Sequence, residues 1–331
     1  MKPRTLPQSA QFPKNLRALD IRRDLASVAD LVELCFADHL HDDGRRYLRQ
    51  LRLAARSGPL LDLAAARGIA GLPLSGYVWL ENDVVVGNLT LMPYGSGSHR
   101  RFNIANVAVH SSFRQRGIAK ALTQAALRGI KSRGVTETWL QVDEKNQNAL
   151  GLFHSLGFVE KMRRTSWRAT PGRTLTGPLD GIRPRQPSDW PHQKRWLEAT
   201  YPEDVRWLLP LNIHHLRPYG LLNRIIRERT TRHWSAEKRG EMLGVLTWQS
   251  PSRGADRLWL AVSPNREEEA ISMLLDYANG HNRLNRSLTL DYPGGQSDTA
   301  LKQVGFVSKH TLIWMTFPWE NNEPAAKLSQ Q

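Results

Sequence analysis

Three short segments of this chain recur in its second half. GNLTLM at 87–92 returns as GVLTWQ at 244–249, VAVHSSFR at 107–114 returns as LAVSPNRE at 260–267, and LGFVEK at 156–161 returns as VGFVSK at 304–309. The separation of the copies shortens slightly along the chain, as loop deletions in one copy would cause. Because 331 residues also exceed what one ordinary core fills, the recurrence predicts two domains that share one fold.

Hydrophobic periodicity in the first half alternates between strand and helix patterns. A polar turn at Asn82–Asp83 separates two β-rich runs, which predicts a hairpin over 77–94. Asp24 is predicted to cap the first helix, and Gly134 to end a later one. The order of elements predicts an α/β fold of α+β type, a mixed and largely antiparallel sheet flanked by helices. We expect strands at 16–23, 102–110, 136–142 and 163–169, and helices at 24–40, 43–56, 116–134 and 146–157.

A stretch rich in proline and glycine, TPGRTLTGPLDG, separates the two halves and is typical of a linker. Its position defines the expected domain organisation. We expect an N-terminal tail at 1–14, a first domain at 15–170, a linker at 171–179, a second domain at 180–318 and a C-terminal tail at 319–331.

The chain carries 46 basic and 31 acidic side chains, and residues 1–168 hold most of the excess positive charge. Such a balance suits a polyanionic ligand or nucleic acid, although solubility explains it equally well. Cys35 is the one cysteine, so no intrachain disulfide forms, and its apolar neighbours predict a core position. The sequence shows no secretion signal and no apolar run long enough for a membrane span, so we expect a cytoplasmic protein without membrane contact.

The segment HSSFRQRGIAKAL at 110–122 joins a predicted strand to a predicted helix through a short basic turn. Backbone N–H groups at a helix N-terminus favour an anion, and Gly117 allows close approach of a bulky diphosphate. Arg114 and Arg116 add positive charge. The spacing fits neither a Walker loop nor a dinucleotide fingerprint. It therefore predicts a different phosphate-bearing cofactor; the alternative is an ordinary helix start with exposed arginines.

The run Arg114-Gln115-Arg116-Gly117-Ile118-Ala119 resembles the Gln/Arg-x-x-Gly-x-Gly/Ala signature of the GCN5-related N-acetyltransferase (GNAT) superfamily. A second block of that family, Asn-x-x-Ala-x-x-Leu-Tyr-x-x-x-Gly-Phe, is matched with Phe153 at the tyrosine position. The resemblance covers 15–168 directly and 180–318 through the repeat. It implies a tandem-repeat member with a degenerate second GNAT domain. The matching residues of the second block are Asn146, Ala149, Leu152, Gly157 and Phe158.

The resemblance implies that acetyl-CoA is the cosubstrate and that the loop at 114–119 holds its pyrophosphate. The backbone of Val107, Ala108 and Val109 would pair with the pantetheine arm where the next strand, 136–142, splays away. Asn146 would bond the pantetheine or help to close this slot. Simple burial also explains the three strand residues, and helix capping also explains Asn146.

The expected chemistry is direct attack of an amine on the acetyl thioester, with stabilisation of the oxyanion by backbone N–H groups and removal of the amine proton by a base. The strand at 102–110 carries no carboxylate, so Glu81 and His110 are the candidate bases, with a water chain as the alternative. A solvated turn and a polar strand end explain the same two residues. Phe153 cannot protonate the leaving thiolate, so that proton must come from elsewhere or from solvent.

The second copy lacks both signatures. Three carboxylates, Glu267–Glu269, replace the amide-lined loop, no glycine follows Arg266 there, and counting back from Phe306 places Gly294 where the first copy has Asn146. Carboxylates repel a diphosphate. We therefore expect the second domain to serve in packing, in walls of the substrate pocket or in dimerisation.

The leading prediction is an acetyl-CoA-dependent N-acetyltransferase that acts in its first domain on a primary amine of a small molecule or protein. The alternatives are a nucleic-acid- or ribosome-associated acyltransferase and a noncatalytic acyl-CoA sensor, and the molecule is expected to be a monomer or a homodimer. A basic stripe on the predicted second helix, Arg45, Arg49, Arg52 and Arg56, is either a solvated face or an attraction for an acidic partner. HLHDDG at 39–44 is predicted to be a loop and helix cap, and no metal is expected.

Overall fold

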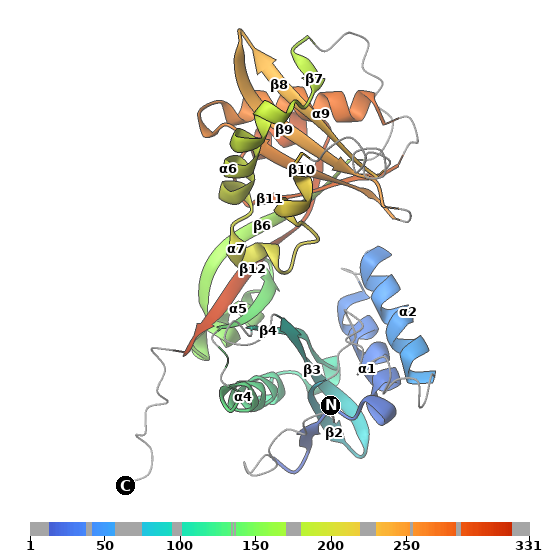
Figure 1. Ribbon diagram of the computed structural model, residues 1–331. Coiled ribbons are helices and arrows are strands. Elements are labelled where there is room, and N and C mark those ends of the chain that lie inside the picture. Colours follow the sequence, from blue (N-terminus) through green and yellow to red (C-terminus); the bar gives the residue numbers. More distant parts are fainter. Residues whose placement is uncertain are drawn as a thin grey trace. The chain divides into compact units, whose positions relative to one another are not determined.

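The computed structural model describes residues 13–37, 42–56, 75–94, 101–133, 135, 137–169, 180–218, 230–251, 254–282 and 286–319. These residues form two compact units. Unit 1 comprises residues 1–161 and 314–331, and unit 2 comprises residues 162–313. Each unit is a sheet with helices packed on it, which confirms the predicted mixed α/β fold class (Figure 1).

In unit 1 the strands are ordered β1-β2-β3-β4-β5-β12. Neighbouring strands from β1 to β4 are antiparallel, and β4 and β5 are parallel. The elements are β1 (Leu16–Ala18), α1 (Ile21–Phe36), α2 (Asp42–Arg56), β2 (Ser75–Glu81), β3 (Val84–Tyr94), β4 (Arg101–Val109), the 3₁₀ helix η3 (Ser111–Phe113), α4 (Ile118–Lys131), β5 (Glu137–Asp143) and α5 (Gln147–Ser155), with β6 (Val159–Ala169) and β12 (Val307–Pro318) each divided between the units.

Helices α1 and α2 cover one face of the unit 1 sheet, and α4 covers the other (Figure 1). The α1 and α2 core includes Val78 and Ala108 from the sheet. On the opposite face, a Cβ added to Gly87 would lie 2.8 Å from Ile118 Cγ2. Gly87 therefore lets α4 approach the sheet closely. Its counterpart Gly244 does the same for α9 in unit 2, where an added Cβ would lie 3.2 Å from Leu274 Cδ1.

Unit 2 repeats this order of elements, with strands β12-β6-β11-β10-β9-β8-β7. Only β10 and β11 are parallel among the neighbours whose register is defined. Its further elements are β7 (Ile182–Pro184), η4 (Pro187–Asp189), α6 (Trp190–Thr200), α7 (Glu203–Arg206), η5 (Ile213–Leu216), β8 (Thr231–Lys238), β9 (Glu241–Gln249), β10 (Asp256–Val262), η6 (Pro264–Arg266), α9 (Glu267–Gly280), β11 (Leu288–Pro293) and α10 (Asp298–Gln303).

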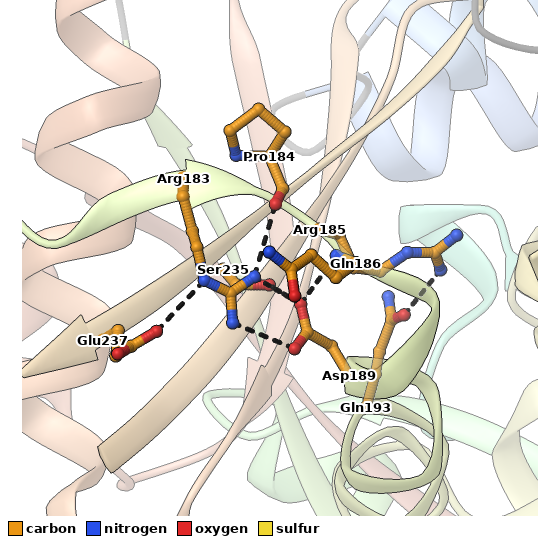
Figure 2. Close-up of polar contacts among 8 residues, drawn as sticks. All are labelled: Arg183, Pro184, Arg185, Gln186, Asp189, Gln193, Ser235 and Glu237. Atoms are coloured by element: carbon orange, nitrogen blue, oxygen red, sulfur yellow. Dashed lines mark hydrogen bonds and ion pairs between the residues drawn. The ribbon is translucent and has the colours of Figure 1, made fainter. Parts of the chain in front are cut away.

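A repeated ion pair ties the first strand of each unit to its first helical segment. In unit 1, Arg17 bonds both carboxylate oxygens of Asp24 at 2.6 and 2.8 Å. In unit 2, Arg183 bonds both carboxylate oxygens of Asp189 at 2.7 and 3.0 Å, as Figure 2 shows. The prediction that Asp24 caps α1 is therefore wrong: Asp20 is the N-cap and accepts from Arg22 N, while Asp24 is buried and paired.

Both hairpins turn through two residues with positive φ. In unit 1 these are Asn82 and Asp83, at 48° and 63°, which confirms the predicted hairpin. In unit 2 they are Arg239 and Gly240, at 54° and 77°. Two consecutive left-handed residues match the right-handed twist of the strands that they join, so the repeat extends to turn geometry.

The last strand of each sequence repeat is divided between the units: residues 162–169 of β6 belong to unit 2, and residues 314–318 of β12 belong to unit 1. Phe317 of β12 stacks edge-on against Phe158 with ring centroids 5.4 Å apart, inside unit 1. Trp167 of β6 is fully buried in the core of unit 2. The units consequently divide between Lys161 and Met162 rather than in the expected linker, whose residues 171–179 lie outside the described part of the chain.

Candidate functional site

The basic turn between β4 and α4 has two left-handed residues, Gln115 with φ 60° and Gly117 with φ 77°. A Cβ added to Gly117 would meet nothing within 4 Å, so the space in front of the loop is open. The first helical bond of α4 runs from Ala121 N to Gly117 O at 2.9 Å. The N–H groups of 118–120 therefore have no partner within the helix, and they form the positive end of its dipole.

The loop is braced by its own arginines. Arg114 Nε donates to Val109 O at 3.2 Å, and Arg116 donates from one guanidinium nitrogen to Ser112 O at 3.1 Å. Arg116 also lies over the Phe113 ring, 5.0 Å from its centroid. Both arginines are exposed. Since a guanidinium carries five N–H donors, each side chain supports the loop and still presents positive charge at its surface.

The pairing of β4 with β5 ends before this loop, and the separation of the two strands beyond Ile104 is called the slot below. The two strands pair only from Arg101–Glu137 to Ile104–Leu140, although β4 continues to Val109 and β5 to Asp143. The backbone of 107–109 therefore lies on a strand edge that β5 no longer covers. A separated strand edge supplies backbone donors and acceptors to an extended ligand, as in β-strand addition.

A β-bulge interrupts β4 at the mouth of the slot. Asn88 pairs with Ala108 and Thr90 pairs with Ala105, so Asn106 and Val107 together stand opposite the single residue between Asn88 and Thr90. Asn106 has a φ of 52°. Asparagine tolerates this left-handed conformation better than most residues, so the residue type fits the bulge.

Polar side chains surround the bulge on the face covered by α1 and α2. Asn88 Nδ2 donates to Asn106 O at 2.9 Å, and Asn106 Nδ2 donates to Tyr47 Oη at 2.8 Å. Asn88 and Thr90 are fully buried, and Asn103 is 6% exposed. The carboxamide oxygens of Asn88 and Asn103 have no hydrogen-bond partner among the described residues. Buried unpaired acceptors are costly and are typical of functional sites.

Sequence reasoning missed Tyr47, Asn88 and Thr90 as site residues. Tyr47 lies on α2, and its hydroxyl reaches β4 across the sheet face. Burial raises the pKa of Tyr47 to about 12, despite the opposing hydrogen bond from Asn106. The hydroxyl is therefore protonated at neutral pH. The signal in the sequence was the pair of polar residues, Asn88 and Thr90, inside the largely apolar strand segment GNLTLM, because a buried strand position rarely holds an amide.

The two candidate bases line one shallow hollow at the loop end of the sheet, together with Phe113. Glu81 Oε1 accepts from Trp79 Nε1 at 3.0 Å, and His110 Nδ1 accepts from Ser112 N at 3.3 Å as the N-cap of η3. With Nδ1 accepting, a neutral His110 ring carries its proton on Nε2. The structure thus brings Glu81 and His110 together.

Asn146 and Phe153 both have structural partners. Asn146 caps α5, where its Oδ1 accepts from Ala149 N at 3.1 Å, and its side chain is exposed. Phe153 is 5% exposed and packs edge-on against Phe158 with centroids 5.7 Å apart. Contact of either residue with a cofactor stays a prediction.

Unit 2 has the same opening between parallel strands. Pairing of β10 with β11 ends at Leu258–Leu290, while β10 continues to Val262 and β11 to Pro293. Tyr201, which is fully buried, fills this opening: its hydroxyl donates to Asp291 O at 3.0 Å and accepts from Leu260 N at 3.4 Å. The slot of unit 2 is therefore closed by a side chain of its own chain.

Carboxylates occupy the start of α9, where unit 1 has its open loop. Glu267 accepts from Tyr292 Oη at 3.1 Å and from Ser297 Oγ at 2.6 Å, and Glu269 pairs with Arg266. Sequence counting placed Gly294 in the position of Asn146. The N-cap of α10 is instead Ser297, because α10 spans six residues whereas α5 spans nine.

Cys35 is partly buried and packs against the α1 and α2 core rather than within it, and Sγ lies 3.4 Å from Val109 O. Within the basic stripe, Arg52 pairs with Asp30 at 2.7 Å and with Glu33 on α1, so part of the stripe serves packing between helices. The described residues contain no group of three or more potential metal ligands, and residues 39–41 lie outside them. Among the described helices, none has the length and apolar content of a membrane span.

Comparison with known proteins adds to this geometry. Residues 37–158 match the model of the Acetyltransferase (GNAT) family. The chain is 36% identical over 69 residues to the [Ribosomal protein bS18]-alanine N-acetyltransferase of Escherichia coli K12. These 69 residues are 20% of this chain and 47% of that protein. It is 34% identical over 92 residues to N-alpha-acetyltransferase 30 of Schizosaccharomyces pombe, 28% of this chain and 61% of that protein. The chain thus spans about half the length of the first of these relatives.

Among solved structures, a GCN5-related N-acetyltransferase from Sphaerobacter thermophilus resembles nearly the whole chain. The superposition covers 92% of this chain and 96% of that structure, with a TM-score of 0.59 and 15% sequence identity. A putative acetyltransferase from Pyrococcus horikoshii covers 94% and 92%, with a TM-score of 0.50 and 14% identity. At such identities the likeness shows the fold alone.

Proposed function

We infer that the chain belongs to the GNAT superfamily, because residues 37–158 match its family model, and from that premise we propose that it is an acetyl-CoA-dependent N-acetyltransferase whose active site lies in unit 1. One observation carries the proposal: an uncovered edge of β4 leads directly into a loop with two left-handed residues at the N-terminus of α4. That combination offers backbone groups to an extended arm and amides to a diphosphate. Unit 2 is proposed as a degenerate copy without a cofactor site.

The residues present fit acetyl-CoA, which supplies an acetyl thioester to an amine. The loop fits a pyrophosphate because the space before Gly117 is open and the N–H groups of 118–120 point there from a helix N-terminus. The loop residues proposed to hold it are Arg114, Gln115, Arg116, Gly117, Ile118 and Ala119.

The slot would hold the pantetheine arm through main-chain bonds from Val107, Ala108 and Val109. Asn146, with its Oδ1 committed to the cap, would contribute its Nδ2 group, and Phe153 would contribute apolar surface. A backbone N–H at the bulge would stabilise the oxyanion, which is the largest single contribution in many acyl transfers.

Glu81 and His110 remain the proposed bases, and conservative variants separate their roles. Glu81→Gln keeps an acceptor for Trp79, and His110→Asn keeps an N-cap acceptor for η3. A general base contributes about 10²–10⁴-fold. Loss of that size in one variant, together with a changed pH–rate profile, would identify the base; retention of activity in both would point to a water chain.

Calorimetric titration with acetyl-CoA tests the cofactor site. We expect one site per chain, abolished by Gly117→Glu, which places a charge and a side chain in the proposed phosphate loop. Gly240→Glu is the matched control, because Gly240 has the same φ of 77° and nothing within 4 Å of an added Cβ. Two sites would contradict a degenerate unit 2, and tight binding without turnover on any amine would favour an acyl-CoA sensor.

For the acceptor, a primary amine is the general proposal, and a protein amino terminus is the specific candidate. The partial similarity to enzymes named for a ribosomal protein alanine and for an N-alpha amino group supports it. Exposed Arg45 and Arg49 on α2 would attract acidic segments of such a partner. Acetylation rates measured with a panel of peptides that have free amino termini, and with free polyamines and amino sugars, decide between the acceptor classes. Salt-dependent RNA binding would support the nucleic-acid-associated alternative.

A further inference from the structure

We propose that Asn88 is a positioning residue for acetyl transfer: its side chain orients the Asn106–Val107 peptide so that the Val107 N–H faces the open slot. The inference rests on the proposed function, because it assigns a role within the same acetyl-CoA site. It concerns a residue that the phosphate-loop motif does not include and that lies on β3, one strand away from the slot.

The contacts of Asn88 explain how it acts. The bulge in β4 removes Asn106 from the ladder with β3, so the pairing of strands no longer fixes the direction of its peptide. Asn88 Nδ2 donates to Asn106 O at 2.9 Å, from a side chain that is fully buried. Tyr47 Oη holds the Asn106 side chain at 2.8 Å from the helix side. With a longer bond from Asn106 Nδ2 to Thr90 Oγ1 at 3.5 Å, three hydrogen bonds fix a residue whose φ of 52° is otherwise unfavourable.

Peptide geometry gives the direction of the next N–H. The described peptide bonds are all trans. In a trans peptide the C=O and the following N–H point in opposite directions. Since Asn88 draws the Asn106 carbonyl toward β3, the Val107 N–H points away from β3. That is the side of β4 from which β5 has separated beyond Ile104.

Unit 2 supplies the internal comparison. Val245 stands at the register of Asn88, and β9 pairs with β10 residue for residue without a bulge. Leu260 is the counterpart of Val107 in the repeated LAVS segment, and its N–H reaches the Tyr201 hydroxyl at 3.4 Å. An amide at this place in the fold therefore does face the slot. In unit 2, regular strand pairing is enough to orient the Leu260 N–H, and no side chain is needed. In unit 1, the bulge interrupts the pairing, and Asn88 orients the corresponding N–H of Val107.

The test measures the bound thioester carbonyl directly. Acetyl-CoA labelled with ¹³C at that carbonyl is bound to the full chain, and isotope-edited infrared spectra record its stretch. We expect the stretch to fall on binding to the wild type, because a hydrogen bond to the oxygen weakens the C=O bond. Asn88→Val, which installs the unit 2 residue, should return the stretch most of the way to its free value while the Kd for acetyl-CoA changes less than about threefold, below the tenfold that 1.4 kcal/mol represents.

Two further variants keep the outcome decisive. Tyr47→Phe removes the acceptor for the Asn106 side chain but keeps the ring, and it should give an intermediate stretch. Tyr201→Phe removes a buried hydroxyl from unit 2 and should leave the stretch at the wild-type value. If Asn88→Val does not fold, Tyr47→Phe decides the question.

The possible failures are distinguishable. A wild-type stretch in both Asn88→Val and Tyr47→Phe would overturn the role of Asn88 and leave the proposed function standing. Absence of acetyl-CoA binding to the wild type would overturn the proposed function itself. With any acceptor amine that the panel identifies, a fall in kcat without a matching rise in KM for acetyl-CoA would support positioning, and a rise in KM alone would contradict it.

Discussion

The two units share a strand opening and fill it in different ways. In unit 1 the edge of β4 beyond Ile104 is uncovered, and the loop after it is open at Gly117. In unit 2 the corresponding edge of β10 is bridged to β11 by the Tyr201 hydroxyl, and carboxylates occupy the start of the following helix. One fold therefore supports either an unpaired strand edge or one that is bridged by a side chain, depending on a few residues.

The difference also shows which features belong to the fold and which to the site. The bidentate ion pair, the left-handed hairpin turn and the glycine beneath the long helix occur in both units. The bulge in β4, Asn88 and the open loop occur in unit 1, while unit 2 has regular pairing, Val245 and Glu267. The shared features stabilise the fold, and the unshared ones surround the slot.

Substitutions in β6 and β12, the two strands that are divided between the units, should give the largest effects. Phe317→Ala should destabilise unit 1, and Trp167→Ala should destabilise unit 2, each by about 3–5 kcal/mol for loss of a buried aromatic. On the proposed function acetyl-CoA should raise the melting temperature of unit 1, so differential scanning calorimetry with and without it should identify the unit 1 transition. If Phe317→Ala lowered only the other transition, the division of the chain into these units would be incorrect.

A pH dependence should distinguish unit 2. Burial lowers the pKa of His233 to about 3, with a further contribution from Arg185. Because this pKa is below the unfolded value, the unfolded state binds the proton first, and His233 costs stability as pH falls below about 6.5, by about 1.4 kcal/mol per pH unit. His233→Gln should flatten this slope between pH 6 and about pH 4. Urea unfolding across that range measures it, and an unchanged slope would exclude His233 as its source.

Removal of the hydroxyl in the closed slot should have a moderate effect. Tyr201→Phe leaves Leu260 N without its hydroxyl acceptor and leaves Asp291 O with the longer bond from Arg164 at 3.4 Å, and we expect a loss of about 1–3 kcal/mol in the free energy of unfolding of unit 2. Binding of acetyl-CoA should remain at one site per chain, because the carboxylates at the start of α9 are unchanged. A second site in this variant would show that Tyr201 alone excludes the cofactor.

The smallest effect separates the two roles of Asn146. Asn146→Ala removes the cap of α5 and should cost about 1 kcal/mol. Asn146→Asp keeps the capping oxygen, so stability should hold, but the Nδ2 donor is lost and the Kd for acetyl-CoA should rise about twofold to fivefold, less than a full hydrogen bond. An unchanged Kd in Asn146→Asp would assign Asn146 to the cap alone.

Local sequence patterns determined much of this protein. The Asn82–Asp83 turn and the strand–loop–helix around Gly117 depend on neighbours in the chain, and both were predicted correctly. The apolar period predicted a strand over 16–23, but β1 ends at Ala18 and residues 21–23 already belong to α1. The recurrence of GNLTLM as GVLTWQ correctly paired β3 with β9 as equivalent strands. Asp24 was predicted to be a helix cap because an acidic side chain fits that position. Its actual partner is Arg17, which the packing of β1 beside α1 brings within hydrogen-bond distance.

Only the tertiary structure decided the features that depend on distant residues. No local pattern places Tyr47 beside Asn106, puts Tyr201 between β10 and β11, or moves Phe317 into the core of unit 1. The bulge at Asn106 becomes visible only when β4 is paired with β3, because an extra residue is defined by its partner strand. The sequence by itself determined which elements form and where the basic loop precedes α4. Packing across the sheet decided which of two equivalent slots stayed open.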